Sequence, residues 1–228
     1  MTATLPLAGP RRRGRHSRPS TFRMAGIRLH LRARGALFFA AGVVGVTAAG
    51  WWAGDWLVHR EWLGGADARI PVVAAAPLLG AVLAATGLGG ADEELERSTA
   101  VPWRPIRALH ILAVTAVLGV ALAVIGLWEP RTYGAFELVR NVLGYVGMVA
   151  GASVLLGARL AWAPAFGYAA VVYLAAPKPL RPETAWWTWS LQPWSASMAT
   201  RTAAAFFVAG IILYANFGPR ASRHPEPP

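Results

Sequence analysis

The most concentrated set of chemically active side chains is a short acidic run between two apolar segments. It comprises Asp92, Glu93, Glu94 and Glu96, followed by Arg97. Asp92 is a suitable helix N-cap, and carboxylates in a first helical turn are stabilised by the positive end of the helix dipole. The run predicts a short helix that docks a partner, and a solvated turn is the alternative interpretation. A divalent metal site is disfavoured because adjacent carboxylates project in different directions.

Two further charged residues, Glu137 and Arg140, stand at the start of an apolar segment. Ionisable groups at membrane depth are costly, which makes them candidates for function. Three residues apart on a helix, the two side chains can neutralise each other. Because they lie near the outer end of the segment, we favour this membrane-embedded polar pair as a structural feature over a contact with substrate.

The common kinds of catalytic machinery are missing from the sequence. The chain has no cysteine, and Ser153 lies within an apolar segment with no histidine placed to activate it. The single lysine, Lys178, stands between two prolines and follows no phosphate-binding glycine pattern. We therefore expect no enzyme activity, no metal and no cofactor in this chain, with ATP bound only by a partner subunit.

The elements around these residues are strongly apolar. Of the 228 residues, 55% are hydrophobic and 14% charged, and the mean hydropathy is +0.41. A helix needs about 20 apolar residues to cross the hydrocarbon core of a bilayer. Six segments approach that length, at residues 35–58, 70–90, 108–128, 135–158, 160–176 and 201–217. They predict an all-α, polytopic membrane protein with six transmembrane helices.

Arginines set the expected orientation. The formal net charge is +11, and nine arginines fall in residues 1–34, which contain no acid. Positive residues that flank membrane spans stay in the cytoplasm, so this end is placed there, and an even number of spans places the other end there too. We expect a multi-pass protein of the bacterial plasma membrane. A nucleic-acid partner is not expected, because membrane topology explains a basic tail beside apolar spans better.

The chain divides into four parts. Residues 1–21 predict a disordered basic tail, 22–34 an interfacial helix, 35–217 the six-helix transmembrane domain, and 218–228 a cytoplasmic tail. Two alternatives stay open for residues 22–34. Residues 27–34 alternate strictly between apolar and polar types, which is the period of a strand, and a basic segment that only orients the first span fits equally well.

Small residues and tryptophans complete the pattern. Gly147 and Gly151 form a GxxxG spacing with Gly144 near the same face, which lets another helix approach closely. Residues 177–200 hold four of the 11 tryptophans of the chain, namely Trp186, Trp187, Trp189 and Trp194. Tryptophan prefers the membrane interface. We expect this segment to lie in or dip into the outer leaflet as an anchor, with a gate or lipid-facing site at the outer mouth as the alternative.

This layout resembles the membrane subunit of type-2 ATP-binding-cassette exporters. The resemblance covers roughly residues 22–217. It implies that residues 22–34 match the elbow helix, 91–101 the coupling helix that contacts the ATPase, and 177–200 the outer re-entrant element. It also implies six helices per subunit, a second permease copy or homologue, and two separate ATPase subunits.

Two functions follow as hypotheses. The first is the transmembrane subunit of an ATP-driven exporter of a hydrophobic or amphiphilic substrate, coupled to its ATPase through residues 91–101. The second is a non-transporting integral membrane protein, an accessory or assembly factor whose glycine-lined face packs on a larger partner. The scarcity of charges within the apolar segments favours a hydrophobic cargo over a small ion.

Overall fold

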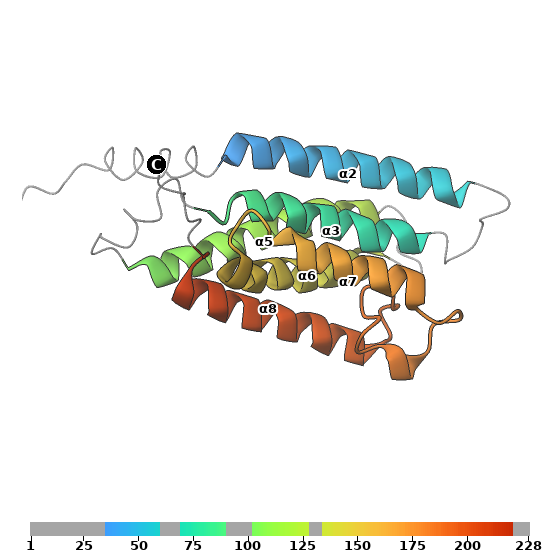
Figure 1. Ribbon diagram of the computed structural model, residues 1–228. Helices are drawn as coiled ribbons and strands as arrows, with labels where there is room; N and C mark the ends of the chain where they lie inside the picture. Colours follow the sequence, from blue (N-terminus) through green and yellow to red (C-terminus); the bar gives the residue numbers. More distant parts are fainter. Residues whose placement is uncertain (1–34, 60–68, 90–101, 128–133, 221–228) are drawn as a thin grey trace, which may run out of the picture.

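The computed structural model describes residues 35–59, 69–89, 102–127 and 134–220, and these residues fold into six α-helices (Figure 1). The prediction of an all-α fold is confirmed for this part of the chain. The helices are α2 (Ala36–Val58), α3 (Ile70–Thr86), α5 (Trp103–Leu127), α6 (Ala135–Leu156), α7 (Trp162–Ala175) and α8 (Ser197–Phe217). A short 3₁₀ turn, η2 (Pro182–Thr184), lies between the last two.

Two helices begin earlier than their hydropathy predicts. The third predicted span starts at residue 108, whereas α5 starts at Trp103. Pro105 falls in the first turn of α5, where a missing backbone N–H costs no intrahelical bond, so proline does not end the helix there. The sixth predicted span starts at residue 201, whereas α8 starts at Ser197. The extra first turns, residues 103–107 and 197–200, are polar or contain proline, and a hydropathy criterion therefore excludes them.

Four of the described helices, α2, α5, α6 and α8, are long and apolar enough to cross a membrane. The other two are shorter: α3 has 17 residues and α7 has 14. At 1.5 Å per residue these span about 25 and 21 Å, less than the ~30 Å hydrocarbon core. Leucine, valine, phenylalanine and tryptophan side chains cover much of the exposed helix surface. The chain is a helical protein with four candidate membrane spans.

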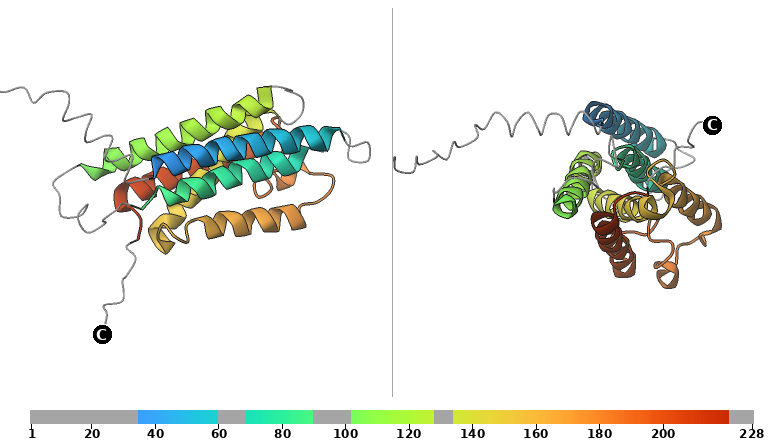
Figure 2. Two further views of the ribbon diagram at one scale, coloured as in Figure 1. Left: turned by 90° about the horizontal axis from the view of Figure 1, so that it is seen from above. Right: turned by 60° about the vertical axis from the view of Figure 1, so that its left-hand side comes forward.

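Helix α6 lies at the centre of the bundle, as the view along the helices in Figure 2 shows. It contacts α3, α5, α7 and α8, whereas α2 lies at the periphery against α3 and α5. Gly147 permits this arrangement, since a Cβ atom there would overlap the backbone of Phe206 in α8. Gly210 of α8 faces Gly147 in turn. The two helices therefore touch backbone to backbone, as small residues allow within membranes.

The described residues place charge unevenly at the two ends of the bundle. We call the end where α5 begins and α8 ends the arginine end, because its charged residues are all arginines in the described part of the chain: Arg104, Arg107, Arg159 and Arg220. The opposite end carries basic residues as well, namely Arg69, Arg140, Lys178, Arg181 and Arg201. The described acids, Asp55, Glu137 and Glu183, all lie toward the opposite end. The backbone N–H of Arg220 donates to the Ser153 carbonyl (2.9 Å), and its guanidinium donates to the Leu155 carbonyl (3.1 Å). Residues after α8 thus satisfy carbonyls at the C-terminus of α6.

Candidate functional site

Polar residues at the start of α6 face the connection between the last two helices. We call this connection, residues 176–196, the α7–α8 segment. Glu137, Asn141 and Tyr145 recur every four residues and therefore share one face of α6. Glu137 is 1% exposed, and the other two are fully buried. Polar side chains at this burial need hydrogen-bond partners, and Glu137 and Asn141 have them.

Glu137 binds two backbone N–H groups. One carboxylate oxygen accepts from the N–H of Gly134 (2.8 Å), which precedes α6. The other accepts from the N–H of Trp194 (2.8 Å) in the α7–α8 segment. A carboxylate in the first turn of a helix is stabilised by the helix dipole. Glu137 therefore caps its own helix and anchors the segment at the same time.

Arg140 binds the next residues of the same segment. Its guanidinium donates to the carbonyl of Gln192 (2.7 Å) and to that of Pro193 (3.3 Å). Its Nε also donates to the side-chain oxygen of Asn141 (3.1 Å). Glu137 and Arg140 were expected near the outer interface as a mutually neutralising pair. In the structure both side chains are buried, and both bind main-chain groups of residues 192–194.

Asn141 joins three parts of the bundle. Its amide nitrogen donates to the carbonyl of Val73 in α3 (2.9 Å) and to that of Ser190 (2.7 Å). The Val73 carbonyl needs this donor because the residue four positions later is Pro77, which has no N–H to complete the helical bond. One amide group thus satisfies two carbonyls: that of Val73, which Pro77 leaves without a helical donor, and that of Ser190, which lies in non-helical backbone.

The α7–α8 segment fits over α6 through Trp189. This side chain is fully buried and lies on Gly144, where a Cβ would overlap the indole ring. Its ring centroid lies 5.0 Å from that of Tyr145 and 5.7 Å from that of Tyr168, to which it is nearly parallel at 13°. The prediction that the tryptophans here are interface anchors is wrong for Trp189, which is part of the core.

The neighbouring tryptophans behave differently. Trp186 is 62% exposed and Trp194 is 64% exposed, as an interface anchor requires. The segment is also tied to α7, because the hydroxyl of Tyr168 donates to the carbonyl of Trp187 (2.6 Å). Apart from η2, it consists of turns and extended backbone. The segment is therefore a compact irregular unit, buried on one side and exposed on the other.

The physical role of this cluster follows from its setting. Irregular backbone is tolerated within a membrane protein only where protein or water satisfies its polar groups. Glu137, Arg140 and Asn141 supply a carboxylate, a guanidinium and an amide to that backbone. We call these three residues the α6 clamp. Both oxygens of Glu137 already accept hydrogen bonds, so the carboxylate is better suited to hold structure than to accept a proton from a substrate.

The other residues singled out in the sequence fall in different places. Gly147 and Gly151 lie against α8, and Gly144 lies against Trp189, so all three glycines pack within the chain itself. Residues 22–34 and 91–101 lie outside the described residues, and with them Asp92, Glu93, Glu94, Glu96 and Arg97. Among the described residues, no group of three or more His, Cys, Asp or Glu side chains could hold a metal ion.

Sequence reasoning missed several residues of the site. The sequence offers two signals for them, and the first is the polar stripe at positions 137, 141 and 145 of an otherwise apolar segment. A second signal is Pro77 inside an apolar segment, which implies an unsatisfied carbonyl four residues earlier. Neither signal identifies Ser190 or Gln192, because their backbone carbonyls, rather than their side-chain types, make the contacts.

Comparison with models of protein families, with curated proteins and with solved structures finds no match for this chain. What can be said of the chain therefore comes from its structure. It is a helical protein with four candidate membrane spans among the described residues, and an irregular segment is hydrogen-bonded to its central helix.

Proposed function

We propose that this chain is the membrane subunit of an ATP-driven exporter of a hydrophobic or amphiphilic compound, with ATP bound by a separate subunit. The observation that carries the proposal is the α7–α8 segment. It is irregular, it lies between the last two helices, and it is held in the bundle by buried polar side chains. This is the position that the exporter layout gives to its outer re-entrant element.

The use of the charged residues supports an apolar cargo. The guanidinium of Arg140 and the carboxylate of Glu137 bind backbone groups of the α7–α8 segment. The surfaces of α5, α6 and α8 that remain accessible are almost entirely apolar. A hydrophobic or amphiphilic molecule can contact such surfaces without losing hydrogen bonds to water, whereas a small ion cannot.

The proposed coupling site is the acidic run of residues 91–101. These residues lie outside the described part, but α3 ends and α5 begins at the arginine end, so both neighbours of the run are there. In the proposed orientation this end faces the cytoplasm, where a soluble ATPase is accessible. The orientation rests on the nine arginines of residues 1–34.

Co-purification tests the proposal. The tagged full-length chain is extracted from its native membrane, and captured proteins are identified by mass spectrometry. We expect an ATPase with a phosphate-binding loop to be captured by the unaltered chain and to be lost when Glu93, Glu94 and Glu96 are all replaced by glutamine. The matched control is Glu183→Gln, an exposed acid at the opposite end. Failure to capture an ATPase with the unaltered chain contradicts the proposal.

Labelling tests the orientation. The chain has no cysteine, so a single introduced cysteine reports one position. With a membrane-impermeant thiol reagent on intact cells, we expect Glu183→Cys to be labelled and Arg104→Cys to be labelled only after the cells are opened. The reverse pattern would place the arginine end outside and remove the proposed coupling site from the cytoplasm.

A non-transporting accessory protein is the second candidate. The α6 clamp favours it, because Glu137, Arg140 and Asn141 are engaged in structural bonds. The glycine face originally assigned to a partner is occupied, since Gly147 and Gly151 pack on α8. An accessory protein would therefore bind its partner through another face. Such a protein would keep its captured partners when the acidic run is neutralised.

A further inference from the structure

Helix α3 contains a proline near its midpoint. Pro77 has no N–H to bond the carbonyl of Val73, and it divides the helix into an outer half, residues 70–76, and an inner half, residues 78–86. Proline is one of the few features that bend a helix sharply, because the missing bond is one that would hold the two halves in line. The two halves of α3 can therefore change their relative direction more easily than those of an unbroken helix.

The inner half of α3 is fixed to the rest of the bundle. Leu78, Ala81 and Ala84 are buried in the main apolar core. Just beyond the helix, the carbonyl of Leu88 accepts a hydrogen bond from the hydroxyl of Tyr214 in α8 (2.7 Å). Both kinds of contact belong to the inner half and the residues that follow it, so they do not depend on where the outer half lies.

The outer half of α3 has a second set of contacts. Leu191 and Ala176 of the α7–α8 segment form, with Val172 of α7, a small apolar cluster separate from the main core, and Ile70 and Ala74 pack against it. Other residues of the outer half, Val73 and Ala76, belong to the main core. The outer half is therefore shared between the main core and the α7–α8 segment.

Asn141 of α6 is bonded to both of these parts. Its amide nitrogen donates to the carbonyl of Val73 in the outer half (2.9 Å) and to that of Ser190 in the α7–α8 segment (2.7 Å). The helical donor that would otherwise serve Val73 is missing because of Pro77. Loss of the Asn141 amide therefore weakens the hold of α6 on the outer half and on the segment at the same time, and leaves the inner half unaffected.

We propose that the outer half of α3 and the α7–α8 segment form one lid that opens from α6 as a unit, with Pro77 as its hinge in α3 and Asn141 as its latch. Two independent observations carry the inference: the apolar cluster that the two parts share, and the two bonds that they receive from one amide. Opening of the lid uncovers the polar start of α6. The lid is a property of the fold and does not depend on whether the chain exports a substrate.

Hydrogen exchange of the full-length chain in detergent tests the lid. Overlapping peptides, measured by mass spectrometry, report residues 72–76 in the outer half of α3, 82–86 in the inner half and 186–194 in the segment. In Asn141→Leu we expect exchange to become about tenfold faster or more, by similar factors, in residues 72–76 and 186–194. Residues 82–86 should not change, and Asn216→Leu, the control, should change none of the three. Faster exchange in residues 186–194 alone, or in all three stretches, would overturn the proposal.

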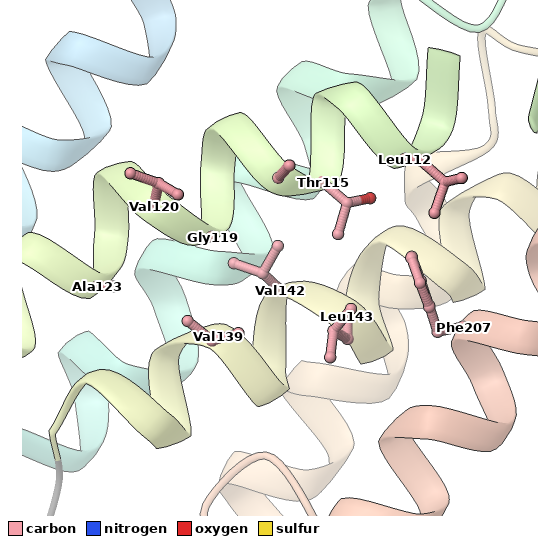
Figure 3. Close-up of a pocket in the computed structure, with 10 residues that line it drawn as sticks. Leu112, Thr115, Gly119, Val120, Ala123, Val139, Val142, Leu143 and Phe207 are labelled. Carbon is pink, nitrogen blue, oxygen red and sulfur yellow. The ribbon is translucent and has the colours of Figure 1, made fainter. Parts of the chain in front are cut away.

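Leu191→Ala tests the shared cluster without removing a hydrogen bond. Its side chain is buried among the residues that join the segment to α3, so the same two stretches should exchange faster together, again by about tenfold or more. The matched control is Leu143→Ala. Leu143 lines an apolar groove between α5 and α6 (Figure 3), and because it is two residues from Asn141 it lies on the opposite side of α6. The control should leave all three stretches unchanged, and unchanged exchange of residues 72–76 in Leu191→Ala contradicts a common lid.

The hinge is tested by combining Pro77→Ala with Asn141→Leu. Alanine supplies an N–H to the Val73 carbonyl, so α3 is then held by helical bonds along its whole length. We expect the double variant to exchange faster in residues 186–194 only, with residues 72–76 as slow as in Pro77→Ala alone. Linked exchange that persists without Pro77 refutes the hinge. Thermal unfolding shows first whether Pro77→Ala is folded, and if it is not, the result of Leu191→Ala decides the proposal by itself.

Discussion

Replacement of Asn141 by leucine tests the α6 clamp most directly, because leucine keeps a similar shape and removes every hydrogen bond. The amide nitrogen of Asn141 serves two buried carbonyls, those of Val73 and Ser190. A buried carbonyl that loses its partner costs roughly 1–3 kcal/mol. Two such groups predict a loss of about 2–6 kcal/mol, and the Nε of Arg140 loses its acceptor as well. The lower half of that range is expected, since hydrogen bonds within membrane proteins are weaker than this estimate assumes.

Asn216→Leu is the matched control. Asn216 is exposed, and its amide donates only to the Ile212 carbonyl one turn earlier in α8 (2.8 Å). That carbonyl keeps its helical donor when the side chain changes, so the expected loss is below about 0.5 kcal/mol. Any general effect of placing leucine in an apolar helix is shared by the two variants and cancels in the comparison.

The assay is thermal unfolding in one detergent at one scan rate, followed by intrinsic tryptophan fluorescence. For a chain of this length, 1 kcal/mol corresponds to roughly 2–4 °C in Tm, so Asn141→Leu should unfold about 4–16 °C below the unaltered chain. The Asn216→Leu variant should stay within about 2 °C of it. Equal Tm values for Asn141→Leu and Asn216→Leu would show that the Asn141 bonds do not hold the α7–α8 segment.

Further predictions concern packing around the same helix. Gly147→Leu should prevent stable folding, because its Cβ would overlap the backbone of Phe206, whereas Gly151→Ala should be almost neutral, since its nearest neighbour is 3.7 Å away. Size-exclusion profiles in detergent distinguish the two. Trp189→Ala should lower stability by roughly 3–5 kcal/mol, and Trp186→Ala, at a 62% exposed position, by less than about 0.5 kcal/mol. Tm values at a fixed scan rate measure both, and similar losses would contradict the buried position of Trp189.

The positions of the helices could be predicted from the sequence because length and hydropathy determine them. A backbone in an apolar environment must satisfy its own polar groups, and a run of apolar residues does so as a helix. The starts of α5 and α8 were less predictable. Arg104 and Ser197 lower the local hydropathy, yet both fit the first turn of a helix, where the chain still has access to polar surroundings.

The contacts of the site were not predictable in the same way. The spacing of Glu137 and Arg140 shows that the two side chains can meet, but each also binds main-chain groups more than 50 residues later. Any residue except proline supplies a backbone N–H, and every residue supplies a backbone carbonyl. The type of a residue therefore does not show whether its main chain is such a partner. Trp189 shows the same limit, because only the fold places its ring over Gly144.

The α6 clamp also separates two kinds of substitution. Its bonds reach the backbone of residues 190–194, so exposed side chains of the segment, such as Trp194, can change without removing them. A change of Arg140 or Asn141 instead removes a donor from two carbonyls at once, in a setting where water does not replace it. A loss of function on changing Arg140 is therefore explained by a displaced α7–α8 segment, unless an experiment shows that the segment stays in place. Only a substitution that keeps the segment in place can assign that residue a contact with cargo.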